Sequence, residues 1–337
     1  MIKEAIKKVV ERKNLSREEA AASMKEIMEG AASPSQIACF ITALRMKGET
    51  VEEITGCAEE MRAHATKIHP KAKHLVDTCG TGGDVSHTIN VSTLSALVAA
   101  GAGVQIAKHG NRSVSSKCGS ADLLEALGVK IDLEPKLVEK CIDEVGIGFI
   151  FAPLFHQAMK HAMPSRREIG IRTIFNILGP LTNPANAHAQ ILGVFDEKLT
   201  KMMAEVLGNL GVKEAMVVHG MDGLDEVSIS AETKASHLKE GDIETYYIKP
   251  EDFGIEKGSR EDIVVHNIEE GKTAALEVLE GKEKGAKRNI VLLNAGAAIL
   301  LGGKAKDLKQ GIELAGKSID SGAALKKLKE LIKFSKK

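Results

Sequence analysis

The pattern of apolar positions divides the chain into a helical beginning and a long part where short apolar runs alternate with amphipathic stretches. In the first 66 residues, apolar positions such as Ile2 and Ile6 recur at helical spacing. Capping-box patterns at 16–19 and 50–53 mark further helix starts. These signals predict four helices joined by short turns, which together form a small bundle.

From residue 74 onward the chain alternates between strand and helix patterns. Short apolar runs predict strands at 75–76, 104–107, 149–152, 189–195 and 215–219. The stretches between them have helical spacing and helix-ending glycines. This βαβ alternation is typical of a parallel sheet with helices on its faces.

The fold class that follows is α/β, with a small helical bundle domain and a large α/β domain. We expect the large domain to have a mainly parallel central sheet flanked by helices. Residues 1–68 are assigned to the helical domain, joined in space by a helical segment at about 164–184. Residues 72–160 and 186–337 are assigned to the α/β domain.

Two predicted strand ends lead into loops that are rich in glycine, hydroxyl groups and cations. The first loop, 80–84, reads Gly-Thr-Gly-Gly-Asp and precedes a helix start at 90–93. The second, 108–112, reads Lys-His-Gly-Asn-Arg, and serines follow at 113–120. Glycine backbone, a helix N-terminus and cations favour phosphate. Neither the dinucleotide fingerprint nor the P-loop pattern fits, and a lone Gly-rich turn could simply connect strand to helix.

Composition limits the possible function classes. Lys plus Arg and Asp plus Glu both number 46, so net charge provides no bulk attraction to nucleic acid or an anionic membrane. Five cysteines without C-x-x-C spacing predict free thiols in a reducing compartment. The charged N-terminus and the lack of a long apolar run argue against a signal peptide or membrane span. We therefore expect a cytoplasmic protein with no nucleic-acid or membrane partner.

Two charged groups outside these loops have both a functional and a structural interpretation. Asp225 and Glu226 follow a predicted strand end and offer oxygen ligands of the kind Mg²⁺ prefers, although a solvated acidic turn would look the same. Arg166 could bind a carboxylate with its guanidinium fork, or form a surface pair with Arg167 and Glu168 on a helix.

Five motifs together closely resemble the anthranilate phosphoribosyltransferase family over nearly the whole chain. They are GTGGD at 80–84, NVST at 90–93, KHGNRSVSS at 108–116, RREIGIRTIFNILGPLTNP at 166–184 and DGLDE at 222–226. The resemblance implies transfer of the phosphoribosyl group of 5-phosphoribosyl 1-pyrophosphate (PRPP) to the amine of anthranilate. The products would be N-(5-phosphoribosyl)anthranilate and pyrophosphate, in the Mg²⁺-dependent second step of tryptophan synthesis from chorismate.

The resemblance also implies a set of site residues. It implies PRPP contacts by Gly80, Gly83, Asp84, Thr88, Asn90, Val91, Ser92, Thr93, Lys108, His109, Gly110, Asn111, Arg112, Ser113, Val114, Ser115, Ser116 and Ser120. It implies anthranilate contacts by Gly80, Asn111 and Arg166. It implies two Mg²⁺ ions, one held by Ser92 with Glu226 and the second by Asp225 with Glu226. No catalytic side chain is expected beyond positioning and metal, and a homodimer through the helical domain is a family expectation.

Some points stay open at the level of sequence. Residues 85–87, Val-Ser-His, depart from the smaller or Asn-type residues common in the family. His109 and His156 could line the anthranilate path or be structural histidines. A pyrimidine nucleoside phosphorylase of the same fold and a non-catalytic nucleic-acid-binding relative are the alternative functions. The first would need a different second loop, and the second a strongly basic chain.

Overall fold

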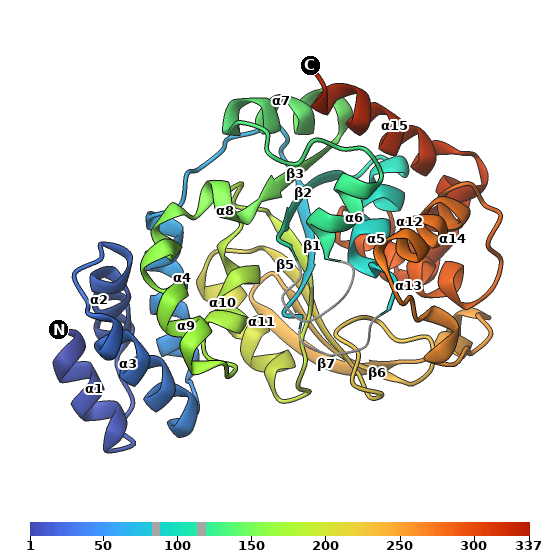
Figure 1. Cartoon of the computed structure of the whole chain (residues 1–337). Coiled ribbons are helices and arrows are strands. Elements are labelled where there is room, and N and C mark those ends of the chain that lie inside the picture. Colours follow the sequence, from blue (N-terminus) through green and yellow to red (C-terminus); the bar gives the residue numbers. More distant parts are fainter. Residues whose placement is uncertain (83–87, 113–118) are drawn as a thin grey trace.

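The computed structural model of the chain describes residues 1–82, 88–112 and 119–337 (Figure 1). It begins with a bundle of four helices, α1 (Ile2–Val10), α2 (Arg17–Met28), α3 (Pro34–Lys47) and α4 (Val51–Ala63). The predicted capping boxes are present: Ser16 and Thr50 each accept a hydrogen bond from the backbone N–H three residues later, and the glutamate there bonds back. The helical prediction for this part of the chain is confirmed.

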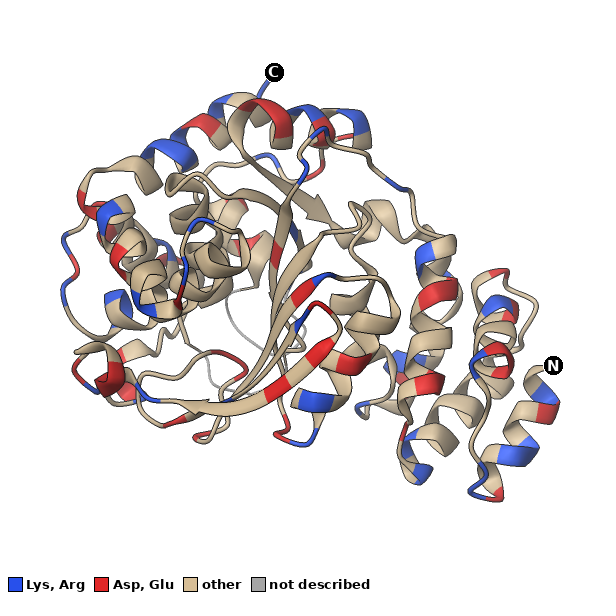
Figure 2. Cartoon of the chain, turned by 180° about the vertical axis from the view of Figure 1, so that it is seen from behind, with Lys and Arg blue, Asp and Glu red and all other residues tan. Residues whose placement is uncertain are grey.

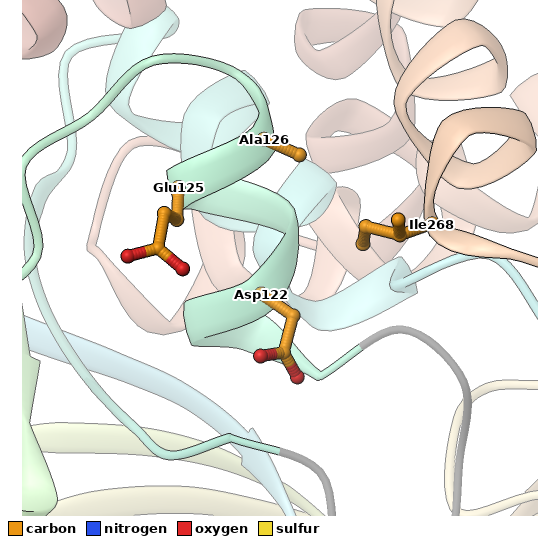
Figure 3. A pocket seen from close by; sticks show the side chains of 4 residues that line it. All are labelled: Asp122, Glu125, Ala126 and Ile268. Carbon is orange, nitrogen blue, oxygen red and sulfur yellow. The ribbon is translucent and has the colours of Figure 1, made fainter.

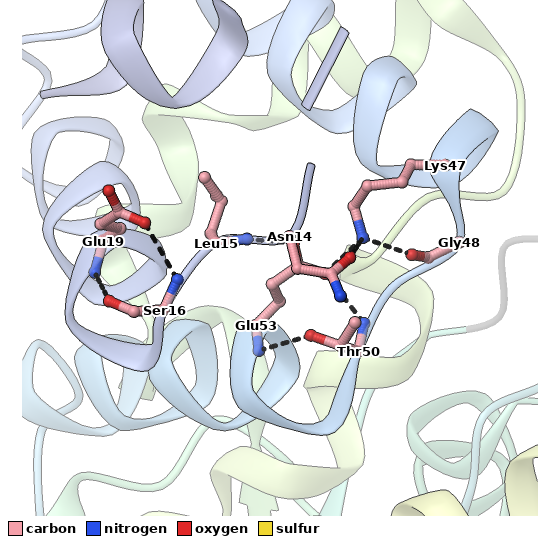
Figure 4. Close-up of polar contacts among 8 residues, drawn as sticks. All are labelled: Asn14, Leu15, Ser16, Glu19, Lys47, Gly48, Thr50 and Glu53. Carbon is pink, nitrogen blue, oxygen red and sulfur yellow. Dashed lines mark hydrogen bonds and ion pairs between the residues drawn. The ribbon is translucent and has the colours of Figure 1, made fainter. Parts of the chain in front are cut away.

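A buried ion pair fixes the connections of the bundle (Figure 4). Glu53 is fully buried, and its carboxylate accepts from the backbone N–H of Leu15 at 2.9 Å and from that of Thr50 at 2.8 Å. The Lys47 ammonium lies 2.9 Å from the same carboxylate and also donates to Asn14. Since a buried carboxylate must be paired and hydrogen-bonded, this arrangement satisfies Glu53 and joins the α1–α2 connection to the α3–α4 turn.

The described residues contain a seven-stranded sheet in the order β3-β2-β1-β4-β5-β6-β7. Its first five strands are parallel and the last two are antiparallel additions. The strands are β1 (Leu75–Gly80), β2 (Gln105–Gly110), β3 (Ile147–Phe151), β4 (Ala189–Gly193), β5 (Glu214–Gly220), β6 (Thr233–Lys239) and β7 (Asp242–Ile248). The mainly parallel sheet is confirmed. The predicted ends of the first two strands, at 76 and 107, were too early, because glycine and polar residues continue both ladders.

Helices cover both faces of the sheet (Figure 1). Val76, Ile191 and Met216 face a core shared with helices that follow the glycine loops or come from the end of the chain. Those helices are α5 (Val91–Gly101), α6 (Ser120–Ala126), α7 (Pro135–Val145), α12 (Ile268–Leu279), α13 (Ala286–Leu301), α14 (Leu308–Asp320) and α15 (Ala323–Ser335). Leu192 and Val217 alternate to the opposite face, where α11 (Leu199–Asn209) and the bundle cover them.

The segment between β3 and β4 is helical and borders the bundle. It contains α8 (Ala152–Phe155), η1 (Gln157–His161), α9 (Met163–Ile169), α10 (Phe175–Leu178) and η2 (Gly179–Thr182), while η3 (Pro250–Phe253) and η4 (Glu261–Ile263) lie later in the chain. α9 packs against α3, and η2 packs against α4. One apolar core therefore runs from the bundle through this segment to the sheet. The domain boundaries given above remain a prediction.

The path of the chain creates a switch point at the carboxyl ends of β1 and β4. From β1 the chain proceeds outward through β2 to β3, and from β4 it proceeds the other way to β5. Gly80 at the end of β1 is level with Gly193 at the end of β4. In open α/β sheets such a reversal opens a crevice where ligands bind. The first glycine loop lies at this position.

Charges of both signs are mixed over the outer helices, in keeping with the zero formal net charge (Figure 2). None of the helices in the described parts of the chain is long and apolar enough to cross a membrane.

The crossing of α2 and α4 provides a stability test. A Cβ on Gly56 of α4 would collide with the carbonyl oxygen of Arg17, whereas one on Gly208 of α11 would make ordinary contact, 3.5 Å from Leu238. Gly56→Ala should lower the free energy of unfolding by about 1–3 kcal/mol through overpacking. Gly208→Ala should raise it by about 0.5–1 kcal/mol through helix propensity. Urea denaturation of both variants measures this. Equal stabilisation by both would contradict the close crossing.

Candidate active site

The first glycine loop is attached to β4 as well as to β1. Beyond Gly80, the Thr81 amide donates to the Gly193 carbonyl at 2.9 Å. The Thr81 hydroxyl accepts from the Phe195 amide at 3.2 Å. The loop is thereby held at the switch point before it leaves the sheet. Thr81 was not assigned a role from the sequence, although its position between two glycines was the available signal.

The acidic loop after β5 contacts this glycine loop through Asp225. The Gly82 amide donates to Asp225 Oδ2 at 2.8 Å, and the Asp225 residue is only 9% exposed. A Cβ on Gly80 would collide with the Asp225 carboxylate, and one on Gly193 would collide with its backbone. Glycine is needed at both positions for close approach. The structure thus brings the first loop and Asp225 together, as the motifs predict.

Asp222, in the same acidic loop, has a different role. Its carboxylate accepts hydrogen bonds from the hydroxyl of Ser228 at 2.6 Å and from that of Ser230. These bonds fold the loop over itself and leave Asp225 and Glu226 as the candidates for ligand chemistry. Asp222 is therefore a loop-shaping residue.

The first turn of helix α5 lies against β1, because the Thr78 hydroxyl donates to the Ser92 carbonyl at 2.9 Å. Within the expected helix start at 90–93 the N-cap is Asn90, and its side chain accepts from the Thr93 amide at 3.0 Å. The residues before the cap are fixed to the segment at the end of η4, because the Ile89 amide donates to the Ile263 carbonyl and Thr88 forms a β-bridge with Val264. Backbone amides at a helix start favour an anion.

Lys108 lies inside β2 and not in the loop after it, which corrects the sequence-based placement. Its side chain is buried, and its ammonium donates to the Thr78 carbonyl at 2.6 Å and to the Ser92 hydroxyl at 3.2 Å. Burial lowers the pKa of Lys108, and the carboxylates of Asp77 and Glu226 oppose that shift. The cation therefore lies beneath the first turn of α5 and orients Ser92.

Asp77 is a buried carboxylate that the sequence analysis missed, because it lies beyond the predicted end of the strand. Its Oδ1 accepts from the His109 amide at 3.1 Å, which joins β1 to β2 one residue before the second loop. Burial raises the pKa of Asp77, while the nearby Lys108 charge opposes the increase. The ladder with β4 continues β1 to Gly80, so a strand prediction that reached this length would have included Asp77.

His109 and His156 form a buried pair on the side of β2 that faces the helical segment. Their Nε2 atoms are 3.2 Å apart, and both residues are under 10% exposed. Burial lowers the pKa of His156 to about 4 and holds the pKa of His109 well below its ordinary value. Both rings are therefore neutral at pH 7, one donating and the other accepting.

The second loop leaves β2 at Gly110, and its cation is paired. Arg112 is exposed, and its guanidinium bonds to Asp122 at 2.9 Å and to Glu125 at 2.8 Å. These two carboxylates project from α6, and with Ala126 and Ile268 they line a surface depression (Figure 3). The resemblance assigns Arg112 to PRPP binding, but in this structure its guanidinium is paired with two carboxylates.

Asn111, which also follows β2, contacts the start of α6. Asn111 is exposed, and its carbonyl accepts from the Ala121 amide at 3.2 Å, which places it beside Ser120 at the start of α6. Outside the described residues lie Gly83, Asp84, Val85, Ser86, His87, Ser113, Val114, Ser115 and Ser116.

Arg166 projects from α9 at the border of the bundle. Its guanidinium lies over the Phe175 ring at 5.0 Å and contacts Met163 sulfur at 3.6 Å. Burial lowers its pKa, and no carboxylate in the described residues opposes that shift. Its guanidinium is thus stacked on an aromatic ring, with no acid holding it in the parts of the chain that the structure describes, while Arg167 is exposed. No described contact joins Arg166 to Gly80 or Asn111.

The donor atoms near the switch point suit a hard divalent cation. Ser92, Asp225 and Glu226 offer only oxygen ligands, and no cluster of three or more His, Cys, Asp or Glu side chains occurs in the described residues. An ion here would depend on one or two carboxylates plus ligand oxygens, which is how proteins commonly hold Mg²⁺.

Comparison with known proteins shows the family of the chain. Residues 72–325 match the glycosyl transferase family, a/b domain, and residues 3–65 match its helical bundle domain. Anthranilate phosphoribosyltransferase from Acetivibrio thermocellus is 56% identical, with 99% of this chain and 97% of the relative covered. The enzyme of that name from Desulfosudis oleivorans is 54% identical, with 100% and 99% covered. The chain belongs to the anthranilate phosphoribosyltransferase family.

Solved structures of the family have the same fold. The anthranilate phosphoribosyltransferase of Thermus thermophilus superposes with a TM-score of 0.94 at 42% identity, covering 99% of both chains. The Saccharomyces cerevisiae enzyme in complex with PRPP and Mg has a TM-score of 0.90 at 29% identity, covering 99% of this chain and 98% of that one. The resemblance drawn from motifs and the α/β fold class are confirmed. Family membership favours the transferase over the phosphorylase and nucleic-acid-binding alternatives.

The buried histidine pair predicts a pH dependence of stability. The pKa of His156 is about 4 in the folded chain, against about 6.5 when unfolded. Between these values the unfolded state binds a proton that the folded state does not. Stability should therefore fall as pH decreases from about 6.5 to about 4, by on the order of 3 kcal/mol for this residue. Denaturation midpoints across this range measure the slope.

His156→Gln keeps a polar side chain but removes the titration, so its midpoint should fall less steeply with pH than that of the native chain. The exposed His69 supplies the control variant, His69→Gln, which should keep the native slope. Parallel slopes for all three proteins would show that His156 is not buried as a neutral ring.

Proposed function

We propose that this chain transfers the phosphoribosyl group of PRPP to the amine of anthranilate, releasing pyrophosphate. The observation that carries the proposal is the meeting of three elements at one switch point. These are the glycine loop after β1, the N-terminal turn of α5 and the acidic loop with Asp225. Amides and carboxylates placed together suit a pyrophosphate with its metal. The reaction would be the second step of tryptophan synthesis from chorismate.

The proposed PRPP site uses backbone more than side chains. Gly80 and the first turn of α5 would bind phosphate through amides, and Lys108 would support that turn from below through Ser92. The other PRPP contacts implied by the family are carried over as proposals, including those outside the described residues. Arg112 would have to exchange the carboxylates of α6 for phosphate.

Mg²⁺ would be held by Asp225, Glu226 and Ser92, and two ions are proposed. The family includes a Saccharomyces cerevisiae structure with PRPP and Mg. When bound, the metal would neutralise charge on the departing pyrophosphate. Asp225 is prepared for this by its bond from the Gly82 amide, which fixes one carboxylate oxygen close to the phosphate loop.

Anthranilate would be held on the bundle side of the site. A Saccharomyces cerevisiae relative has been solved with 4-fluoroanthranilate, at a TM-score of 0.90 and 28% identity. Arg166 would receive the carboxylate, and Gly80 and Asn111 would complete the contacts. The aromatic amine is neutral at pH 7, so it attacks ribose C1 without a strong base, and catalysis rests on positioning. Homodimerisation through the helical domain is also proposed.

The function is tested by following anthranilate fluorescence with PRPP and Mg²⁺. Signal should be lost with the purified chain and be retained when Mg²⁺ is chelated. The double variant Asp225→Asn, Glu226→Gln should be inactive at ordinary Mg²⁺, because the metal loses most of its protein charge. Its circular dichroism should match that of the native chain. Full turnover by the double variant would rule out the metal assignment, and a stable signal with the native chain would refute the function.

The assignment of Arg166 to anthranilate binding is tested with variants of two neighbouring arginines. Removing one partner of a charge-assisted pair costs roughly 2–5 kcal/mol, so Arg166→Ala should raise the KM for anthranilate by about thirty-fold or more. The KM for PRPP should stay within a few-fold. Arg167→Ala should change little, because that residue is exposed and points elsewhere on α9. If both substrates weaken equally in Arg166→Ala, the residue is structural. An effect of Arg167 alone would mean the other arginine binds the acceptor.

A further inference from the structure

Arg62 connects helix α4 of the bundle to η2 and to the end of α11. It lies in the last turn of α4, and its Nε donates to the Leu181 carbonyl at 2.6 Å. One terminal nitrogen donates to the Leu210 carbonyl, at the end of α11, at 3.0 Å. Burial lowers the pKa of Arg62 to about 10, so the guanidinium stays charged at pH 7. Because burying this charge is costly, the two carbonyls that accept from it fix its position.

The segment that Arg62 holds, η2, is fixed from several directions. The Pro180 carbonyl accepts from the Gln190 side chain at 2.7 Å, which attaches η2 to β4. The next carbonyl, that of Leu181, accepts from Arg62. Among the described hydrogen bonds of η2, the bond from Arg62 is the one that comes from the bundle.

The same short segment is joined to the strand that carries one histidine of the pair. The side-chain amide of Asn183, the residue directly after η2, donates to the Ala107 carbonyl at 2.8 Å, two residues before His109 in β2. The backbones of Gly179 and Thr182, at the two ends of η2, oppose the lowering of the pKa of His109 and of His156. The end of η2 is thus bonded to the strand that carries His109, whose ring lies 3.2 Å from that of His156, while Leu181 within η2 accepts from Arg62. A displacement of η2 would move both rings together.

We propose that Arg62 is a positioning residue for the acceptor side of the site. It fixes η2 to the bundle and thereby sets where His109 and His156 stand relative to Arg166, which projects from the bundle border. The proposal rests on the proposed function, because it assigns these rings to the anthranilate side. The PRPP side is built on β1, α5 and the acidic loop, none of which Arg62 contacts in the described residues.

Arg17 provides a matched control. It lies on α2 of the same bundle, pairs with Glu59 at 2.8 Å and donates to the Asn209 carbonyl at 3.4 Å. It therefore attaches the bundle to the end of α11, as Arg62 does, but makes no described contact with η2. Removing Arg17 tests the attachment of the bundle to the end of α11. Removing Arg62 tests that attachment together with the attachment of the bundle to η2.

The experiment compares Arg62→Ala, Arg62→Lys and Arg17→Ala in steady-state kinetics with anthranilate and PRPP. Arg62→Ala should raise the KM for anthranilate about tenfold, and it should leave the KM for PRPP within about twofold of the native value. Arg62→Lys, which can still reach one carbonyl, should fall between Arg62→Ala and the native chain. Arg17→Ala should leave both KM values near native. The melting temperature should fall in Arg17→Ala as in Arg62→Ala, because each variant loses a bond to the end of α11.

A second readout does not require turnover. In protein carrying isotope-labelled histidine, the imidazole NMR signals of His109 and His156 should shift in Arg62→Lys and remain in place in Arg17→Ala. Unchanged histidine signals, or KM values that rise equally for both substrates, would overturn the positioning role. A native chain that does not consume anthranilate would refute the proposed function instead, and the histidine signals would still decide the role of Arg62. If Arg62→Ala does not fold, Arg62→Lys carries both measurements.

Discussion

The close approach of Asp225 to two strand ends is the constraint on which the proposed PRPP site depends. Gly80 and Gly193 end adjacent parallel strands, and neither has room for a Cβ against Asp225. That absence of side chains lets a buried carboxylate accept from the Gly82 amide, which brings the loop after β5 over the loop after β1. A wider residue at either glycine would separate the two loops. The switch point of the sheet would then still exist, but the amides and carboxylates would no longer share it.

Buried polar groups transmit this arrangement to the neighbouring strand. Lys108 places its charge beneath α5, and Asp77 joins β1 to the amide of His109. Each burial is costly. A carbonyl and a hydroxyl accept from Lys108, and an amide donates to one oxygen of Asp77, while the other oxygen is buried without a hydrogen-bond partner among the described residues. One residue beyond Lys108 the side chain turns to the other face, where His109 meets His156. The alternation of a single strand therefore separates a cationic side beneath α5 from a neutral side beneath η2.

The sequence is sufficient for the fold class, the bundle and the helix start at 90–93, because apolar spacing and capping depend on nearby residues. It placed the ends of the first two strands too early, since Asp77 and Lys108 are polar and their burial depends on partners far along the chain. Arg112 shows the same limit. Its cation is visible in the motif, but its pairing with Asp122 and Glu125 requires α6 to fold back beside it. Contacts of this kind have no local pattern.

The two halves of the proposed site differ in what holds them. The PRPP half is built from backbone amides and short loops at the sheet, so its geometry follows from strand register and glycine. The acceptor half depends on side chains from segments that the bundle supports: Arg166 on α9, and the histidine pair on β2 and just after α8. Register cannot fix groups that come from separate layers. A long side chain crossing the boundary can, and Arg62 does so by binding η2 and the end of α11 at once.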